Sequence, residues 1–145
     1  MTRGMAPVVA ATTERPSGRI GALAKAVVHE TNQARRREGR GTLKASRKLN
    51  AAARRRARKQ AGQGFMSHTG WASVIKAVGL DPSDGAGENL SENYASAPGV
   101  VRAWLNSPGH RRNLLDPEYA WIGVGASRNR RTGTVYIAQL FLEAN

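Results

Sequence analysis

A histidine falls in the first turn of a helix that the sequence predicts from its local capping residues. Ser107 and Pro108 indicate a helix start, because serine is a favoured N-cap and proline suits the first helical position. We expect the Ser107 hydroxyl to accept from backbone N–H groups of that turn. His110 then lies beside the positive end of the helix dipole, which disfavours the imidazolium. Near pH 7 we therefore expect a neutral His110 ring, able to accept a proton or bind a metal.

Two other segments supply candidate partners, His68 within residues 65–70 and Glu88 within residues 87–90. Two neutral imidazoles and one carboxylate match the ligand set of open zinc sites, in which water takes the fourth position. The three residues are far apart in the sequence, so their spacing does not establish that they meet. The alternative is structural: Glu88 accepts from backbone or histidine N–H groups, and the histidines tie helices to the sheet.

Positive charge is concentrated in the first part of the chain. The net charge is +13, and residues 1–62 hold 16 Lys and Arg against 3 Asp and Glu, whereas the remainder holds seven of each. This asymmetry predicts attraction to an anionic membrane or cell-wall polymer, although arginine-rich solvated helix faces are the plainer explanation. Sequence-specific nucleic-acid binding is not expected, because no aromatic residue is interleaved with the basic ones. The expected basic surface comprises Arg35, Arg36, Arg37, Arg54, Arg55, Arg58 and Lys59, and Arg56 belongs to the same phosphate-contacting run.

Length and composition predict one domain stabilised by packing alone. The chain has 145 residues and no cysteine, which suffices for a hydrophobic core without disulfides. No apolar run approaches the roughly 20 residues that span a bilayer. The apolar stretch near the N-terminus is shorter than the roughly 7–15 residues of a signal-peptide core, so a flexible end is favoured over the remnant of an export signal. We expect a flexible tail over residues 1–18 and a domain over residues 19–145.

Hydrophobic periodicity predicts helices first and a hairpin last. Helical spacing covers residues 18–37, a segment after Ser46 that ends at residues 62–64, a short segment after His68, residues 97–105 and the capped segment after Ser107. The second helix has a mostly alanine inner face, which predicts close packing. Some extended structure fits residues 88–94, and residues 122–127 and 134–141 form an antiparallel hairpin. The fold class is therefore α+β, with helices packed on a small antiparallel sheet.

Five motifs in order resemble the CAP superfamily (cysteine-rich secretory proteins, antigen 5, plant pathogenesis-related-1), and specifically its cysteine-free bacterial branch. Each motif is weak alone, but together they cover roughly residues 20–142. The motifs are Asn32-x-x-Arg35-x-x-x-Gly39-x-x-x-Leu43, residues 65–69, residues 87–90, Trp104-x-x-Ser107-Pro108-Gly109-His110-Arg111-x-Asn113-Leu114, and Ile122-Gly123-Val124-Gly125 with Tyr136-x-x-Gln139-x-Phe141.

The resemblance implies an α-β-α sandwich whose cleft is lined by His68, Glu88 and His110, with Ser107, Asn89 and Gln139 next to it. In many members a second glutamate follows the tryptophan of the preceding helix; here that position holds Ser107. The family also implies an extracellular or cell-envelope location and recognition of lipid-like or other small ligands. No cofactor is required, and a divalent metal such as zinc is a candidate for the cleft.

Two other functions stay open from the residues. A hydrolase would use metal-activated water in the cleft, because neither Ser67 nor Ser107 lies in a nucleophile-elbow pattern. A basic surface module would bind anionic polymers or membranes. We expect an exported bacterial binding module rather than an enzyme.

Overall fold

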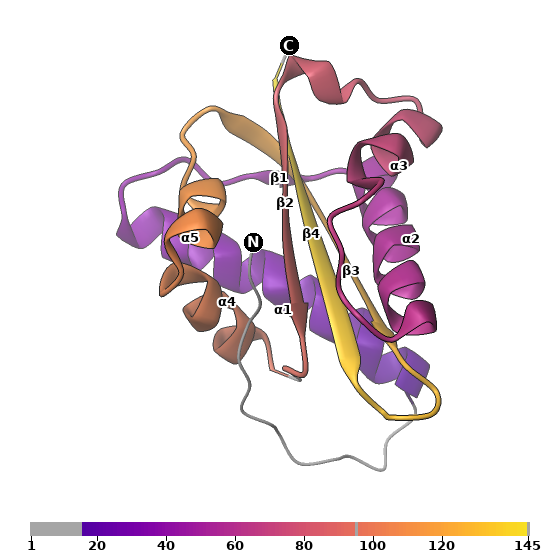
Figure 1. Ribbon diagram of the computed structural model, residues 1–145. Coiled ribbons are helices and arrows are strands. Elements are labelled where there is room, and N and C mark those ends of the chain that lie inside the picture. Colours follow the sequence, from indigo (N-terminus) through magenta and orange to yellow (C-terminus); the bar gives the residue numbers. More distant parts are fainter. Residues whose placement is uncertain (1–15, 95, 145) are drawn as a thin grey trace.

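The computed structural model describes residues 16–94 and 96–144, which form a sheet between two layers of helices (Figure 1). In chain order the elements are α1 (Pro16–Arg37), β1 (Lys44–Ala45), α2 (Arg47–Gln63), α3 (Trp71–Ala77), the 3-10 helix η1 (Pro82–Asp84), β2 (Ala86–Glu92), α4 (Ala97–Leu105), α5 (Pro108–Leu114), β3 (Tyr119–Arg128) and β4 (Val135–Glu143). Every helix expected from periodicity is present, and the α-β-α sandwich is confirmed.

The sheet has the strand order β1-β3-β4-β2. The hairpin of β3 and β4 is antiparallel, as expected, and β2 adds to β4 in antiparallel register, with Glu88 opposite Leu140. However, β1 pairs parallel with β3 through Lys44 and Ala45, so the sheet is mixed rather than wholly antiparallel. Two residues are too few to show an alternating pattern, which explains why the sequence did not predict this strand.

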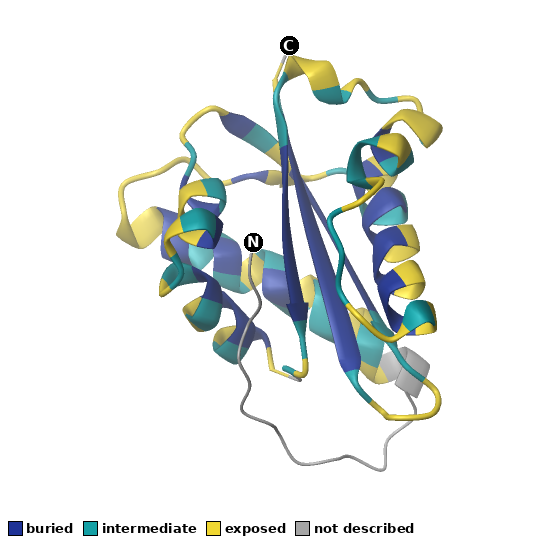
Figure 2. Ribbon diagram, in the orientation of Figure 1, coloured by how far each residue is buried: buried dark blue, intermediate teal, exposed yellow. Residues whose placement is uncertain are grey.

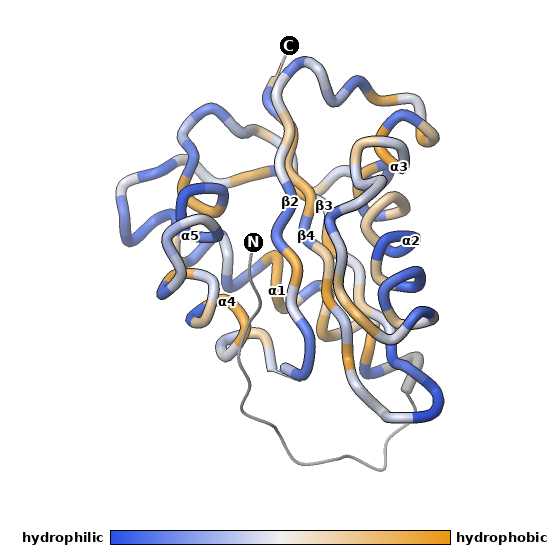
Figure 3. Tube along the Cα trace, viewed as in Figure 1, coloured by the Kyte–Doolittle hydropathy of each residue, from blue (hydrophilic) through white to orange (hydrophobic). Residues whose placement is uncertain are grey.

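The two faces of the sheet carry different helices (Figure 1). Ile137 and Phe141 of β4 belong to a core cluster with α1, α4 and α5. Leu140 and Leu142, one position along, join Leu49 of α2 in the cluster of the other face. Successive strand residues point to opposite faces, so β4 supplies both layers. Figure 2 shows β4 buried along almost its whole length, and Figure 3 shows hydrophobic residues along the strands and inner helix faces.

Helix α2 lies unusually close to β3, as its alanine face predicts. The buried residues of α2 include Leu49, Ala52 and Ala53. A Cβ atom on Gly123 would lie 2.2 Å from the backbone carbonyl carbon of Leu49, and one on Gly125 would lie 2.4 Å from the backbone nitrogen of Arg54. Glycine on the strand and alanine on the helix are therefore both required for this packing distance.

The helix boundaries differ little from those expected. Ser46 caps α2, its hydroxyl accepting from the Leu49 N–H at 3.1 Å, and Gly64 ends the helix in a left-handed conformation. Helix α1 begins at Pro16, so residues 16–18 of the expected tail are helical. The rest of that tail, residues 1–15, lies outside the described residues.

We predict that Gly123→Ala destabilises the protein by about 1–3 kcal/mol or more, because the new methyl group meets the α2 backbone, which cannot move aside as a side chain would. Urea denaturation followed by circular dichroism measures the change. Gly62→Ala is the control, since a Cβ atom there meets nothing within 4 Å. It lies in a helix, so we expect it to be neutral or mildly stabilising. Equal loss in both variants would contradict the packing argument.

Candidate functional site

Glu88 of β2 is buried and paired with a buried arginine. Its side chain is 2% exposed and that of Arg56 is 1% exposed. The guanidinium binds both carboxylate oxygens, with Nε 2.6 Å from Oε2 and Nη2 2.9 Å from Oε1. Two paired hydrogen bonds of this kind offset the unfavourable desolvation of both charges.

Arg56 was expected to contact phosphates, and the structure places it inside instead. It lies on the same face of α2 as Ala52, Ala53 and Gln60, which are buried at helical spacing. The sequence did carry this signal, because position 56 continues the alanine stripe. What it could not show was the carboxylate that makes burial of a guanidinium acceptable.

His68 lies in the loop after α2 and contacts the same carboxylate. Its Nδ1 atom is 2.9 Å from Oε1 of Glu88, and its side chain is 41% exposed. Arg56 also donates to the carbonyl oxygens of Ser67 and Thr69, at 2.8 and 3.0 Å. Gln60 binds the backbone of Ser67 through both its amide oxygen and its amide nitrogen. The loop that carries His68 is therefore fastened to α2 on both sides of the histidine.

His110 lies in α5 and is 3% exposed. Its Nδ1 atom is 2.9 Å from the Ser107 hydroxyl oxygen, and no backbone N–H of α5 is hydrogen-bonded to that hydroxyl. The expected capping bond of Ser107 is therefore wrong: the residue occupies the N-cap position, but its hydroxyl contacts the histidine three residues on. Nε2 of His110 is buried and has no hydrogen-bond partner in the described part of the chain.

The pKa of His110 is lowered to about 4, mainly by burial and to a smaller extent by the nearby His68. The neutral ring expected near pH 7 is thus present, although burial is the main cause. His110 packs near Trp104, with ring centroids 6.5 Å apart. These apolar surroundings disfavour the charged form of the ring.

An amide network joins α5 to the sheet. Asn89 donates from Nδ2 to the carbonyl oxygen of His110 at 3.2 Å and to Oε1 of Gln139 at 3.1 Å. Asn113 donates to Oδ1 of Asn89 at 3.1 Å, and Gln139 donates to Thr31 of α1 at 2.8 Å. Asn89 and Gln139, expected beside the cleft, are fully buried members of this network.

Two consecutive residues of β2 connect the histidines. Glu88 is opposite Leu140 and Asn89 is opposite Gln139, so the two side chains point to opposite faces of the sheet. Glu88 reaches His68 on the α2 side, and Asn89 reaches the His110 backbone on the α5 side. The two histidines are near enough for the charge of His68 to act on His110. The structure therefore joins His68 directly to Glu88, whereas His110 contacts Asn89, on the other face of the strand, through its backbone carbonyl.

These residues fit a zinc ion only in part. Residues 16–94 and 96–144 contain no group of three or more His, Asp or Glu side chains arranged to hold a metal ion. Both oxygens of Glu88 are held by Arg56, which supplies the positive charge that a metal would bring. The unpartnered Nε2 atom of His110 is the feature that suits a ligand or an ion. The His68–Glu88–His110 ligand set stays a prediction.

One member of the expected basic surface is buried. Arg35 is 1% exposed and donates to the carbonyl oxygens of Gly41, Leu114 and Asp116 at 2.7, 2.8 and 3.1 Å. Its guanidinium ties the end of α1 to the residues after α5, so the surface assignment is wrong for this residue. The other members, Arg36, Arg37, Arg54, Arg55, Arg58 and Lys59, are exposed.

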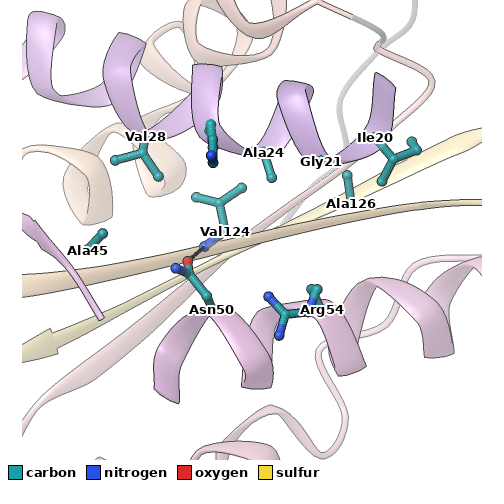
Figure 4. Close-up of a pocket in the computed structure, with 10 residues that line it drawn as sticks. Ile20, Gly21, Ala24, Val28, Ala45, Asn50, Arg54, Val124 and Ala126 are labelled. Atoms are coloured by element: carbon teal, nitrogen blue, oxygen red, sulfur yellow. Dashed lines mark hydrogen bonds between the residues drawn. The ribbon is translucent and has the colours of Figure 1, made fainter. Parts of the chain in front are cut away.

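A cavity of about 380 Å³ lies between α1 and α2 over β3 (Figure 4). Asn50 of α2 accepts from the Val124 N–H at 3.0 Å, which satisfies part of the strand edge that the short β1 leaves uncovered. Arg54 extends from α2 toward the same space. The sequence analysis did not predict this cavity. Its apolar lining is Ile20, Ala24, Val28, Ala45, Val124 and Ala126, and its other lining residues are Gly21, Lys25, Asn50 and Arg54.

We predict that Arg56→Met destabilises the protein by about 3–5 kcal/mol, because it leaves the Glu88 carboxylate buried without its cation. Arg55→Met is the matched control, since Arg55 is exposed on the same helix and its loss should change stability by less than about 0.5 kcal/mol. Chemical denaturation at pH 7 measures both. Similar stabilities for the two variants would show that the buried ion pair does not hold β2 to α2.

Stability should also fall on acidification in a way that depends on His110. The pKa of the ring is about 4 when folded and 6.5 ordinarily, so between these values the unfolded chain binds a proton that the folded chain does not. Above about pH 6.5 the ring is neutral in both states, and the free energy of unfolding is at its full value. As the pH falls from 6.5 to 4, the free energy of unfolding decreases by a total of about 3 kcal/mol. His110→Gln should flatten the pH profile measured by urea denaturation.

His29→Gln is the matched control for that profile, because His29 is exposed on α1 and its loss should leave the pH dependence intact. Parallel profiles for the wild type and His110→Gln would contradict the role assigned to burial.

Comparisons with known proteins agree with this architecture. The chain matches the CAP family, described as the cysteine-rich secretory protein family, over residues 28–141. It is 33% identical over 119 residues to the uncharacterized protein YkwD of Bacillus subtilis, covering 79% of this chain and 46% of that protein. The chain therefore spans less than half the length of this curated relative. None of the helices in the described residues is long and apolar enough to cross a membrane.

Solved structures show the same fold at lower identity. An outer surface protein of Borrelia burgdorferi is 23% identical, with a TM-score of 0.73 over 83% of this chain and 92% of that one. An extracellular protein containing an SCP domain from Bacillus anthracis is 21% identical, with a TM-score of 0.73 over 89% of this chain and 41% of that one. From its match over residues 28–141, and with the sandwich to support it, the chain belongs to the CAP family of cysteine-rich secretory proteins.

Proposed function

We propose that this CAP domain is a binding module of the cell envelope or extracellular space, and that the cavity between α1 and α2 holds a lipid-like ligand. The cavity itself is the observation that carries the proposal. Its volume of about 380 Å³ lies within the range of small-molecule sites, which are mostly apolar with a few polar groups. Similarity to extracellular and surface CAP proteins supports the location.

The lining favours an amphiphile with an acidic head group. Ile20, Val28 and Val124 supply apolar surface for a hydrocarbon chain, each buried methylene of which contributes about 0.8 kcal/mol. Arg54 and Lys25 bring two positive charges to the same cavity. A long-chain carboxylate satisfies both features, since its chain covers the apolar wall and its head group meets the cations.

The polar cluster around Glu88 has a different role in this proposal. Its contacts to Arg56 and His68 support the structural alternative, in which these residues tie α2 and its loop to the sheet. A divalent metal at the histidines stays a secondary proposal, supported by the unpartnered Nε2 atom of His110. Hydrolysis by metal-activated water would depend on that ion, so we propose binding as the activity.

The test is calorimetric titration of laurate into the wild type and Ala24→Phe. The larger side chain fills the cavity from α1, and we expect affinity to fall by about tenfold or more, because several methylene groups lose their buried contacts. Ala22→Phe is the matched control: Ala22 is exposed on the same helix and is not among the cavity residues. Circular dichroism verifies folding of each variant.

Arg54→Gln distinguishes the contribution of the ligand's head group to affinity from that of its hydrocarbon chain. It should weaken laurate binding and leave binding of the uncharged alcohol dodecanol unchanged. Equal heats of laurate binding for the wild type and Ala24→Phe would refute the proposed site.

A further inference from the structure

A second cavity, of about 660 Å³, lies where the end of α2 meets the turn between β3 and β4. Its walls come from two segments that are more than sixty residues apart in the sequence. From α2 and its C-cap it is lined by Arg58, Ala61, Gly62, Gln63 and Gly64; from the hairpin turn it is lined by Ser127, Arg128, Asn129, Arg130, Arg131 and Thr132.

The charge of this cavity is wholly positive. Four of its lining residues are arginines, Arg58, Arg128, Arg130 and Arg131, and none is acidic. Within residues 16–94 and 96–144 the ion pairs found involve other basic residues, namely Arg56, His68 and Arg111. Four guanidinium groups around one space, without a carboxylate among them, attract an anion.

One of these arginines carries a donor that has no acceptor. Nη1 of Arg128 donates to the carbonyl oxygen of Gly133 at 3.1 Å, which fixes the side chain along the turn. Its Nε atom is buried and has no hydrogen-bond partner in the described part of the chain. A buried N–H group without an acceptor is unfavourable. Arg128 lines the cavity, so a bound anion is a source of the missing acceptor.

The turn is held rigidly against α2 by Asn129. Its Nδ2 atom donates to the carbonyl oxygen of Ala61 at 2.7 Å, and its Oδ1 atom accepts from the backbone N–H groups of Arg131 and Thr132, each at 2.8 Å. The backbone that bears the arginines is thus ordered before any ligand arrives, which lowers the entropy lost on binding.

The hydrogen bond from Asn129 to the Ala61 carbonyl also reduces the negative potential at the C-terminal end of α2. Carbonyl groups at a helix C-terminus repel anions. Here Asn129 occupies the carbonyl of Ala61, and the N–H of Gly64 occupies that of Gln60 at 2.9 Å. The arginines therefore set the sign of the potential at this end of the helix.

We propose that this arginine cavity binds a phosphoryl group, carried by a soluble polyphosphate or by a phospholipid head group. Guanidinium groups bind phosphate oxygens through paired hydrogen bonds, and several of them together suit a multiply charged anion. Phe65 follows Gly64 directly and is 57% exposed, so a lipid surface could also be contacted beside the cavity. This site shares no lining residue with the cavity between α1 and α2, and it does not include the Glu88 cluster. Its test is therefore independent of the laurate titration.

The experiment is a titration of pyrophosphate into the ¹⁵N-labelled protein at physiological salt, followed by NMR and calorimetry. We expect chemical-shift changes centred on the turn from Arg128 to Thr132 and on the end of α2. The double variant Arg130→Gln/Arg131→Gln should weaken binding at least tenfold. Arg36→Gln/Arg37→Gln removes the same charge from exposed positions of α1 and should have little effect.

A third variant, Asn129→Ala, tests geometry at constant charge and should also weaken binding, because it releases the turn from α2. Equal losses in the two double variants, or shifts spread evenly over the basic surface, would overturn the proposal and leave only diffuse attraction. Flotation with phosphatidylglycerol vesicles identifies the source of the phosphoryl group. If pyrophosphate displaces the protein from the vesicles, the site binds the lipid head group. If pyrophosphate binds, and the double variant Arg130→Gln/Arg131→Gln weakens that binding, but the protein is not displaced from vesicles, the ligand is a soluble phosphate.

Discussion

The ion pair between Arg56 and Glu88 is the interaction on which the rest of this structure depends. It joins the middle of α2 to the edge strand β2, two elements that the chain separates by a loop, α3 and η1. Both charges are withdrawn from water, and the two guanidinium–carboxylate bonds offset part of the desolvation cost. The remaining donors of Arg56 hold the backbone on either side of His68. The position of the partly exposed His68 is therefore a consequence of the hydrogen bonds that the buried Arg56 makes to the backbone around it.

The layer that contains this pair packs closely against the sheet. Alanines on the helix and Gly123 and Gly125 on β3 remove the side-chain volume that would otherwise separate the two backbones. The opposite layer is assembled differently, around larger side chains such as Trp104 and Phe141 and an amide network through Asn89. Between α1 and α2, where β1 covers only the start of β3, neither arrangement fills the space, and the apolar cavity is the result.

The proposed ligand sites and the interactions that stabilise the fold thus lie in different parts of the molecule. The residues that most resemble a catalytic set are largely occupied with holding the layers together, and Nε2 of His110 is the polar atom among them that still lacks a partner. The two cavities proposed as ligand sites lie at joints between elements, where packing is incomplete and charged side chains can project into the space. In the proposal for the second cavity, arginines of the β3–β4 turn supply the charge. Residues 63–145 have no net charge, but the potential that a ligand meets is set by local placement.

Local sequence determined most of the elements. The capped start at Ser46, the alanine stripe of α2, the order of helices and the final hairpin all follow from short-range spacing. The motifs also implied a shared cleft around Glu88, which stays a prediction. Only the tertiary structure decided the partners. The sequence alone predicts that Arg35 and Arg56 lie at the surface. Their burial is explained only by the acceptors of their hydrogen bonds, carbonyl groups for Arg35 and the Glu88 carboxylate for Arg56. The hydroxyl of Ser107 could cap a helix or bind an imidazole, and the packing of α5 against β2 selected the imidazole. Periodicity shows which face of a helix turns inward, but the free energy of burying a polar group depends on acceptors supplied from distant parts of the chain.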